Sequence, residues 1–103
     1  MPSFVIRRSD VKDDEFPDFN LLNSRQYAEV LRPASYLSQP IEGWGNHRIA
    51  VESCEVSFSE EMVGLQVDFE GGIEEQVARR ILEEIAASIT CATGQPAEVE
   101  QIE

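Results

Sequence analysis

The chain has 103 residues, 42% of them hydrophobic, which suits one globular domain over residues 1–103. Its formal net charge is −12, because 20 acidic side chains face only 8 lysines and arginines. Such an acidic surface repels nucleic acid and anionic membranes, so we expect neither as a partner. The N-terminal residues lack the apolar stretch of a signal peptide and no apolar run could span a bilayer, so we expect a cytoplasmic protein.

The first part of the chain predicts a strand, a loop and a short helix. Residues 4–6 form an apolar run that is typical of a short buried strand. Residues 9–20 contain five acids and a proline and predict a loop. Asn23 and Gln26 have the spacing of a capping box, which begins a helix, and Pro33 ends that helix about two turns later.

Residues 33–47 predict a long ordered loop, because prolines and glycines interrupt them and no hydrophobic period is present. A short extended piece at Tyr36 and Leu37 is the regular structure that we expect there. Trp44, the single tryptophan, stands between two glycines. It is either a contact anchor for a partner or an apolar cap on the core, so the loop is either a binding site or a core cap.

The next segment alternates apolar and polar residues, but the phase of this alternation changes between Val51 and Cys54. One regular strand cannot bury both phases, so we predict a bulge near residues 52–53. We then expect the chain to turn back over residues 59–62 in a four-residue or bulged connection, because two glutamates there disfavour the positive φ of a tight turn. The predicted opposite pairs are Phe58 with Val63, Val56 with Leu65 and Cys54 with Val67, with Glu55 and Asp68 on the water-facing side.

A long amphipathic helix is predicted from about Ile73 onwards. Isoleucine or valine recurs at every fourth position and alanines widen the stripe, so one face of this helix should pack on the sheet. Gly94 and Pro96 mark its C-terminal end. Residues 97–103 predict an edge strand whose acids discourage pairing with other chains.

These elements follow one another in the order β-α-β-β-α-β. This order predicts an α+β fold, a two-layer sandwich of ferredoxin-like or related type. We expect an antiparallel sheet with the helices on one face.

The sequence contains no recognisable catalytic, metal or cofactor motif. A catalytic triad would have to use His47, the single histidine, and no nucleophile motif accompanies it. One histidine and two cysteines cannot form a standard zinc site, and the acids of residues 13–18 lack the spacing of a calcium loop. We therefore predict no catalytic residues, no metal and no cofactor, and we expect that the protein is not an enzyme.

Net charge and the missing catalytic motifs favour a binding protein that masks a basic protein partner, as a monomer or a homodimer. In its small size, acidity and α+β order the chain resembles bacterial toxin-immunity proteins in general character. The resemblance implies that the partner is a toxin, but no motif carries a residue over. The candidate contact residues are Trp44, Asp13, Asp14, Glu15, Asp18, Glu55 and Asp68.

A second function class remains open from the sequence. The chain could be a small ligand-binding or enzymatic domain of ferredoxin-like type, with a pocket around Trp44, His47 and Arg48. Convergent polar groups in such a pocket would favour this class, and a bare acidic face would favour the binding protein.

Overall fold

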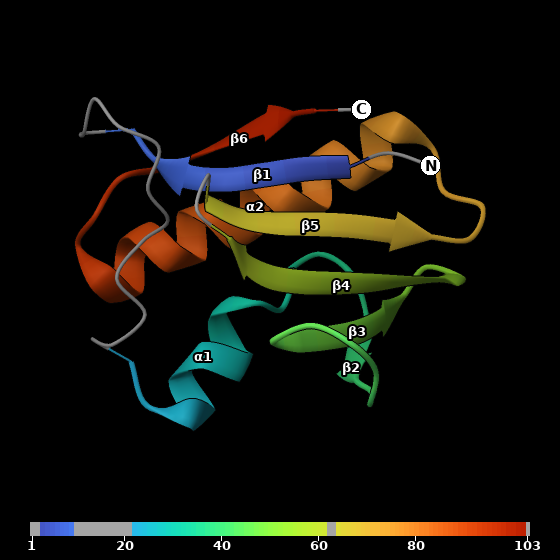
Figure 1. Ribbon diagram of the computed structural model, residues 1–103, viewed down its shortest axis with the longest axis horizontal. Coiled ribbons are helices and arrows are strands. Elements are labelled where there is room, and N and C mark those ends of the chain that lie inside the picture. Colours follow the sequence, from blue (N-terminus) through green and yellow to red (C-terminus); the bar gives the residue numbers. More distant parts are fainter. Residues whose placement is uncertain (1–2, 10–21, 62–63, 103) are drawn as a thin grey trace.

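The strands form one antiparallel sheet, and helices cover one of its faces (Figure 1). The computed structural model describes residues 3–9, 22–61 and 64–102. Within them the sheet has six strands in the order β2-β3-β4-β5-β1-β6, and every neighbouring pair is antiparallel. The elements are β1 (Ser3–Arg8), α1 (Ser24–Val30), β2 (Ser38–Pro40), β3 (His47–Val51), β4 (Cys54–Glu61), β5 (Gly64–Glu70), α2 (Glu75–Thr93) and β6 (Ala97–Gln101).

Both helices lie on the same face of the sheet and make the arrangement a two-layer α+β sandwich. Figure 1 shows α2 running behind β1 and β5, and α1 packs against α2. Their apolar sides and the alternate residues of β1, β3, β4 and β5 form one core. Side chains buried to 0% exposure include Phe4, Ile6, Val56, Phe58, Leu65, Val67, Ile81, Leu82, Ile85 and Ile89.

The two helices agree with the sequence predictions. The capping box of α1 is present, because Asn23 accepts from the Gln26 backbone and the Gln26 side chain accepts from the Asn23 backbone. Helix α2 ends at Gly94 in the left-handed conformation (φ 76°), as the glycine predicted. Neither helix, as far as the described residues extend, is long and apolar enough to cross a membrane.

The predicted register of the β4–β5 hairpin is wrong: each β4 residue pairs with a β5 residue four positions beyond the predicted one. Phe58 pairs with Val67 and Val56 with Phe69, and the pairing continues to Glu61 and Gly64, so only residues 62–63 separate the strands. The expected four-residue connection is therefore also wrong. Val63, the predicted partner of Phe58, lies outside the described residues. A shift by an even number of residues keeps each side chain on its face, so the hydrophobic pattern could not distinguish the two registers.

The predicted bulge at residues 52–53 is instead a tight hairpin turn. Glu52 (φ 51°) and Ser53 (φ 67°) are both left-handed, which is the pattern of a type I′ turn, and Val51 pairs directly with Cys54. The chain reverses here, so Val51 and Cys54 reach the same face of the sheet without a bulge. The turn and β2, which lies within the predicted loop, add two strands to the predicted order.

Candidate functional site

The face of the sheet opposite the helices is polar and charged, and no helix of the described residues packs on it. It consists of alternate residues of the paired strands, because neighbouring residues of a strand point to opposite faces. We call this surface the open face. Its residues are Gln39, Arg48, Ala50, Glu55, Ser57, Ser59, Glu61, Gln66, Asp68, Glu70, Ser3, Val5, Arg7, Glu98 and Glu100.

Negative charge dominates the open face. Its six carboxylates outnumber its two guanidiniums, and the acidic side chains come from β4, β5 and β6. Carboxylates on neighbouring strands repel one another in the absence of a counter-charge. The open face therefore presents an excess of negative charge that favours cationic groups and disfavours anions.

Arg48 is the centre of the first group of charges on the open face. Glu55 lies opposite Glu70 in the sheet, and Arg48 bridges them from β3. Its Nε and Nη2 donate to Glu55 Oε1 over 3.0 and 2.8 Å, and Nη2 also donates to Glu70 Oε2 over 2.5 Å. Arg48 is 7% exposed, but the side chains of Glu55 and Glu70 are 51% and 45% exposed. The hydrogen bonds to Glu55 and Glu70 raise the pKa of Arg48 despite its burial, so both carboxylates keep a charged partner while they face solvent.

Trp44 covers Arg48 at the tip of the loop between β2 and β3. The Trp44 ring centre lies 5.9 Å from Arg48 Cζ, in the range of a cation–π contact. Gly43 lies so close that a Cβ there would come within 2.3 Å of Arg48 Cδ, so a larger residue would force Arg48 to shift. Trp44 is nevertheless 54% exposed. It lies beside the open face rather than over the core, so the interpretation of Trp44 as a core cap is wrong.

Backbone contacts hold this loop away from the core. Asn46 N donates to Phe58 O over 2.8 Å, and Glu60 N donates to Asn46 Oδ1 over 2.8 Å. Gly45 has φ 97° and sits against Phe58 O, where a Cβ would come within 2.8 Å. The glycines on either side of Trp44 thus serve close backbone approach, which leaves the indole on the outside.

Two polar atoms near this group have no hydrogen-bond partner among the described residues. They are Arg48 Nη1 and Ser57 Oγ, and both are buried. Arg48 and Ser57 lie opposite each other on β3 and β4. An unsatisfied buried polar group costs about 1–3 kcal/mol, so this part of the open face contributes less to stability than a fully hydrogen-bonded group would.

A second arginine, Arg7, neutralises two carboxylates at the other side of the open face. Arg7 pairs with Glu98 over 3.5 Å and with Glu100, both on the edge strand β6. Between the two arginines, Asp68 accepts from Ser3 Oγ over 2.6 Å and from Gln66 Nε2 over 3.3 Å. The carboxylates of the open face are thus held in defined positions by neighbours on the same or the adjacent strand.

The structure brings some of the predicted contact residues together and leaves others unplaced. Glu55 and Asp68 share the open face, and Trp44 lies at its border beside Arg48. The acids of the N-terminal loop, Asp13, Asp14, Glu15 and Asp18, lie outside the described residues. Glu70 was missed, because only the true hairpin register places it opposite Glu55.

The predicted pocket around Trp44, His47 and Arg48 is not assembled. His47 and Arg48 are neighbours on β3 and point to opposite faces. His47 lies on the helix side, 6.0 Å from each of the rings of Tyr27 and Phe58, where burial lowers its pKa. Over the described ranges, no group of three His, Cys, Asp or Glu side chains is placed to hold a metal ion.

Comparison with known proteins adds no relative, since no family model, curated protein or solved structure matches the chain. What can be inferred about function therefore comes from the charge and geometry of the open face.

Proposed function

We propose that the protein is a non-enzymatic binding protein that masks a basic protein partner through its open face, in the manner of an immunity protein that blocks a toxin. The observation that carries this proposal is the excess of fixed carboxylates on a sheet face that no described helix covers. Opposite charge attracts the partner over distance and speeds encounter.

The order of the open face supports tight as well as fast binding. Asp68 is held by Ser3 and Gln66, and Glu55 and Glu70 are held by Arg48. Side chains that are already positioned lose little conformational freedom when a partner binds, so more of the contact energy appears as affinity.

Trp44 supplies the apolar anchor of the proposed interface. Its ring packs against the Arg48 guanidinium, yet about half of the residue faces solvent. Tryptophan and arginine are enriched among the residues that dominate binding energy at interfaces.

We further propose that the fold is an extended relative of the ferredoxin-like arrangement. The neighbouring strands β6, β1, β5 and β4, with both helices on one face, support this assignment. Strands β2 and β3 then enlarge the sheet beyond β4 and carry the loop that holds Trp44.

The proposal can be tested by affinity capture from the native host with three baits. The open-face variant carries Glu61→Gln, Asp68→Asn and Glu98→Gln, and it leaves the two carboxylates bound by Arg48 unchanged. The matched control carries Glu29→Gln, Glu75→Gln and Glu83→Gln on the two helices, so both variants have the same net charge. We expect a basic protein that the wild type and the control retain and the open-face variant loses. An acidic partner, or equal retention by all three baits, would contradict the proposal.

A further inference from the structure

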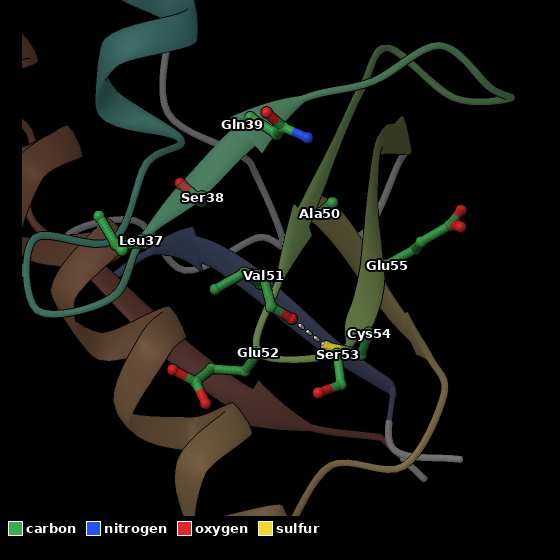
Figure 2. A pocket seen from close by; sticks show the side chains of 9 residues that line it. All are labelled: Leu37, Ser38, Gln39, Ala50, Val51, Glu52, Ser53, Cys54 and Glu55. Carbon is green, nitrogen blue, oxygen red and sulfur yellow. Dashed lines mark hydrogen bonds between the residues drawn. The ribbon is translucent and has the colours of Figure 1, made fainter.

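An open pocket of about 620 Å³ lies at the end of the sheet, beside the turn between β3 and β4 (Figure 2). It is lined by residues 37–39 and 50–55. Figure 2 shows Leu37, Val51 and Glu52 projecting to one side of this hairpin and Gln39 and Glu55 to the other. The lining contains acids and apolar side chains but no lysine or arginine.

We propose that this pocket receives one unbranched cationic side chain, a lysine or an arginine, of the basic partner. This inference rests on the function proposed above and adds a specific contact to it. A lysine or arginine combines an apolar stem with a charged head. The stem would lie along Leu37, and the head group would reach the carboxylate of Glu52.

Leu37 provides the apolar wall. It is 95% exposed, while its neighbour in the lining, Val51, is 3% exposed. A single exposed leucine needs no explanation by itself. Beside a pocket, however, it offers apolar surface that the stem of an incoming side chain would remove from water.

Glu52 provides the charge and occupies an unfavourable backbone conformation. Both central residues of the turn have positive φ, where glycine and asparagine are preferred. No described side chain forms an ion pair with Glu52. Its charge acts on the floor of the pocket, because burial and the Glu52 carboxylate both raise the pKa of the Cys54 thiol. The turn thus keeps an acid next to the pocket at the expense of local stability.

The pocket borders the open face on one side, while Leu37 and Glu52 project to the other side of the hairpin. Gln39, Ala50 and Glu55 form one row across β2, β3 and β4, and Glu70 follows in the same row on β5. The first three of these residues also line the pocket. A partner that covers the open face would have to extend past this row and around the end of the sheet to reach Leu37 and Glu52.

The inference can be tested without the natural partner, by amide NMR titration of the full chain with three capped tripeptides. They are acetyl-Gly-Lys-Gly amide, its arginine analogue and its norleucine analogue, each up to about 20 mM, which covers the millimolar range of weak fragments. We expect the two cationic peptides to shift the amide signals of residues 37–39 and 50–55, and to do so less strongly at high salt. The larger shift of the two indicates which head group fits better. Equal shifts with norleucine, or shifts confined to other regions, would overturn the inference.

Two variants make the test specific. Glu52→Gln should weaken binding of the cationic peptides by about two- to fivefold, the effect of one surface ion pair. Glu83→Gln is the matched control, because it removes one exposed carboxylate from α2, away from the residues that line the pocket. It should leave peptide affinity unchanged. Unchanged affinity in Glu52→Gln would overturn the role of this carboxylate.

The outcome is separable from that of the proposed function. A captured basic partner that binds wild type and Glu52→Gln equally would remove the pocket from the interface and leave the open face intact. Peptide binding at the pocket in a protein that captures no basic partner would support the pocket and contradict the proposed function of the open face.

Discussion

The two faces of the sheet are made by alternate residues of the same strands, but they differ in what their side chains do. On the covered face, Phe58 and Leu65 are fully buried in the core beneath the helices. On the open face, Glu55 and Glu70 are about half exposed and are held by Arg48, part of which has no partner. The covered face thus provides most of the stability, and the open face gives part of it up to hold charge at the surface.

The two arginines of the open face sharpen this comparison. Each neutralises two glutamates, but the side chain of Arg48 is 7% exposed and that of Arg7 is 25% exposed. The Arg48 guanidinium also makes a cation–π contact with the Trp44 ring. We therefore expect the more buried Arg48 to contribute more to stability than Arg7.

The largest effect is expected on the covered face, at Leu65. Leu65→Ala should lower the free energy of unfolding by about 2–5 kcal/mol, because it removes a fully buried side chain and leaves a cavity. The neighbouring open-face variant, Gln66→Ala, should stay within about 0.5 kcal/mol of wild type. Urea unfolding of both variants measures the difference, and similar values would contradict the division of labour between the faces.

An intermediate effect is expected from Arg48→Gln. Removal of the guanidinium leaves Glu55 and Glu70 side by side without a counter-charge, which should cost about 1–3 kcal/mol, since both carboxylates are still partly solvated. Arg7→Gln, at the more exposed group, should cost less than about 1 kcal/mol. The same unfolding assay compares them, and an equal loss would mean that burial does not distinguish the two groups.

The smallest effect concerns the only histidine and depends on pH. Burial lowers the pKa of His47, so the folded state takes up a proton less readily than the unfolded chain. Its contribution to stability is present above the unfolded pKa of about 6.5 and is lost as the pH falls through the folded pKa. His47→Leu should therefore lose less melting temperature than wild type between about pH 7.5 and pH 5. Parallel curves for the two proteins would show that His47 does not titrate differently on folding.

The sequence predicted the covered face better than the open face, for a physical reason. The isoleucine stripe of α2, the capping box of α1 and the left-handed Gly94 are local patterns, and each is present. The register of β4 and β5 depends on where the chain turns, and an even shift preserves the hydrophobic alternation. The pair Glu52 and Ser53 does not resemble a type I′ turn, so an entire hairpin was missed.

The open face could be predicted only in part for the same reason. Glu55 and Asp68 were assigned to the water-facing side from alternation alone. Their relation to Glu70 and Arg48 depends on which residues lie opposite one another, which the alternation does not specify. The contacts of the flanking glycines, Gly43 with the Arg48 side chain and Gly45 with Phe58 O, have no signature in the sequence.

The most direct test of the open face is the association rate of the captured partner at two salt concentrations. Steering by exposed charge is screened beyond about 8 Å at physiological ionic strength, so higher salt should slow association of the wild type and hardly change dissociation. The open-face variant should associate more slowly and depend less on salt, while the helix control should follow the wild type. An association rate that is independent of salt, or one that responds equally in the open-face variant and in the wild type, would contradict the account.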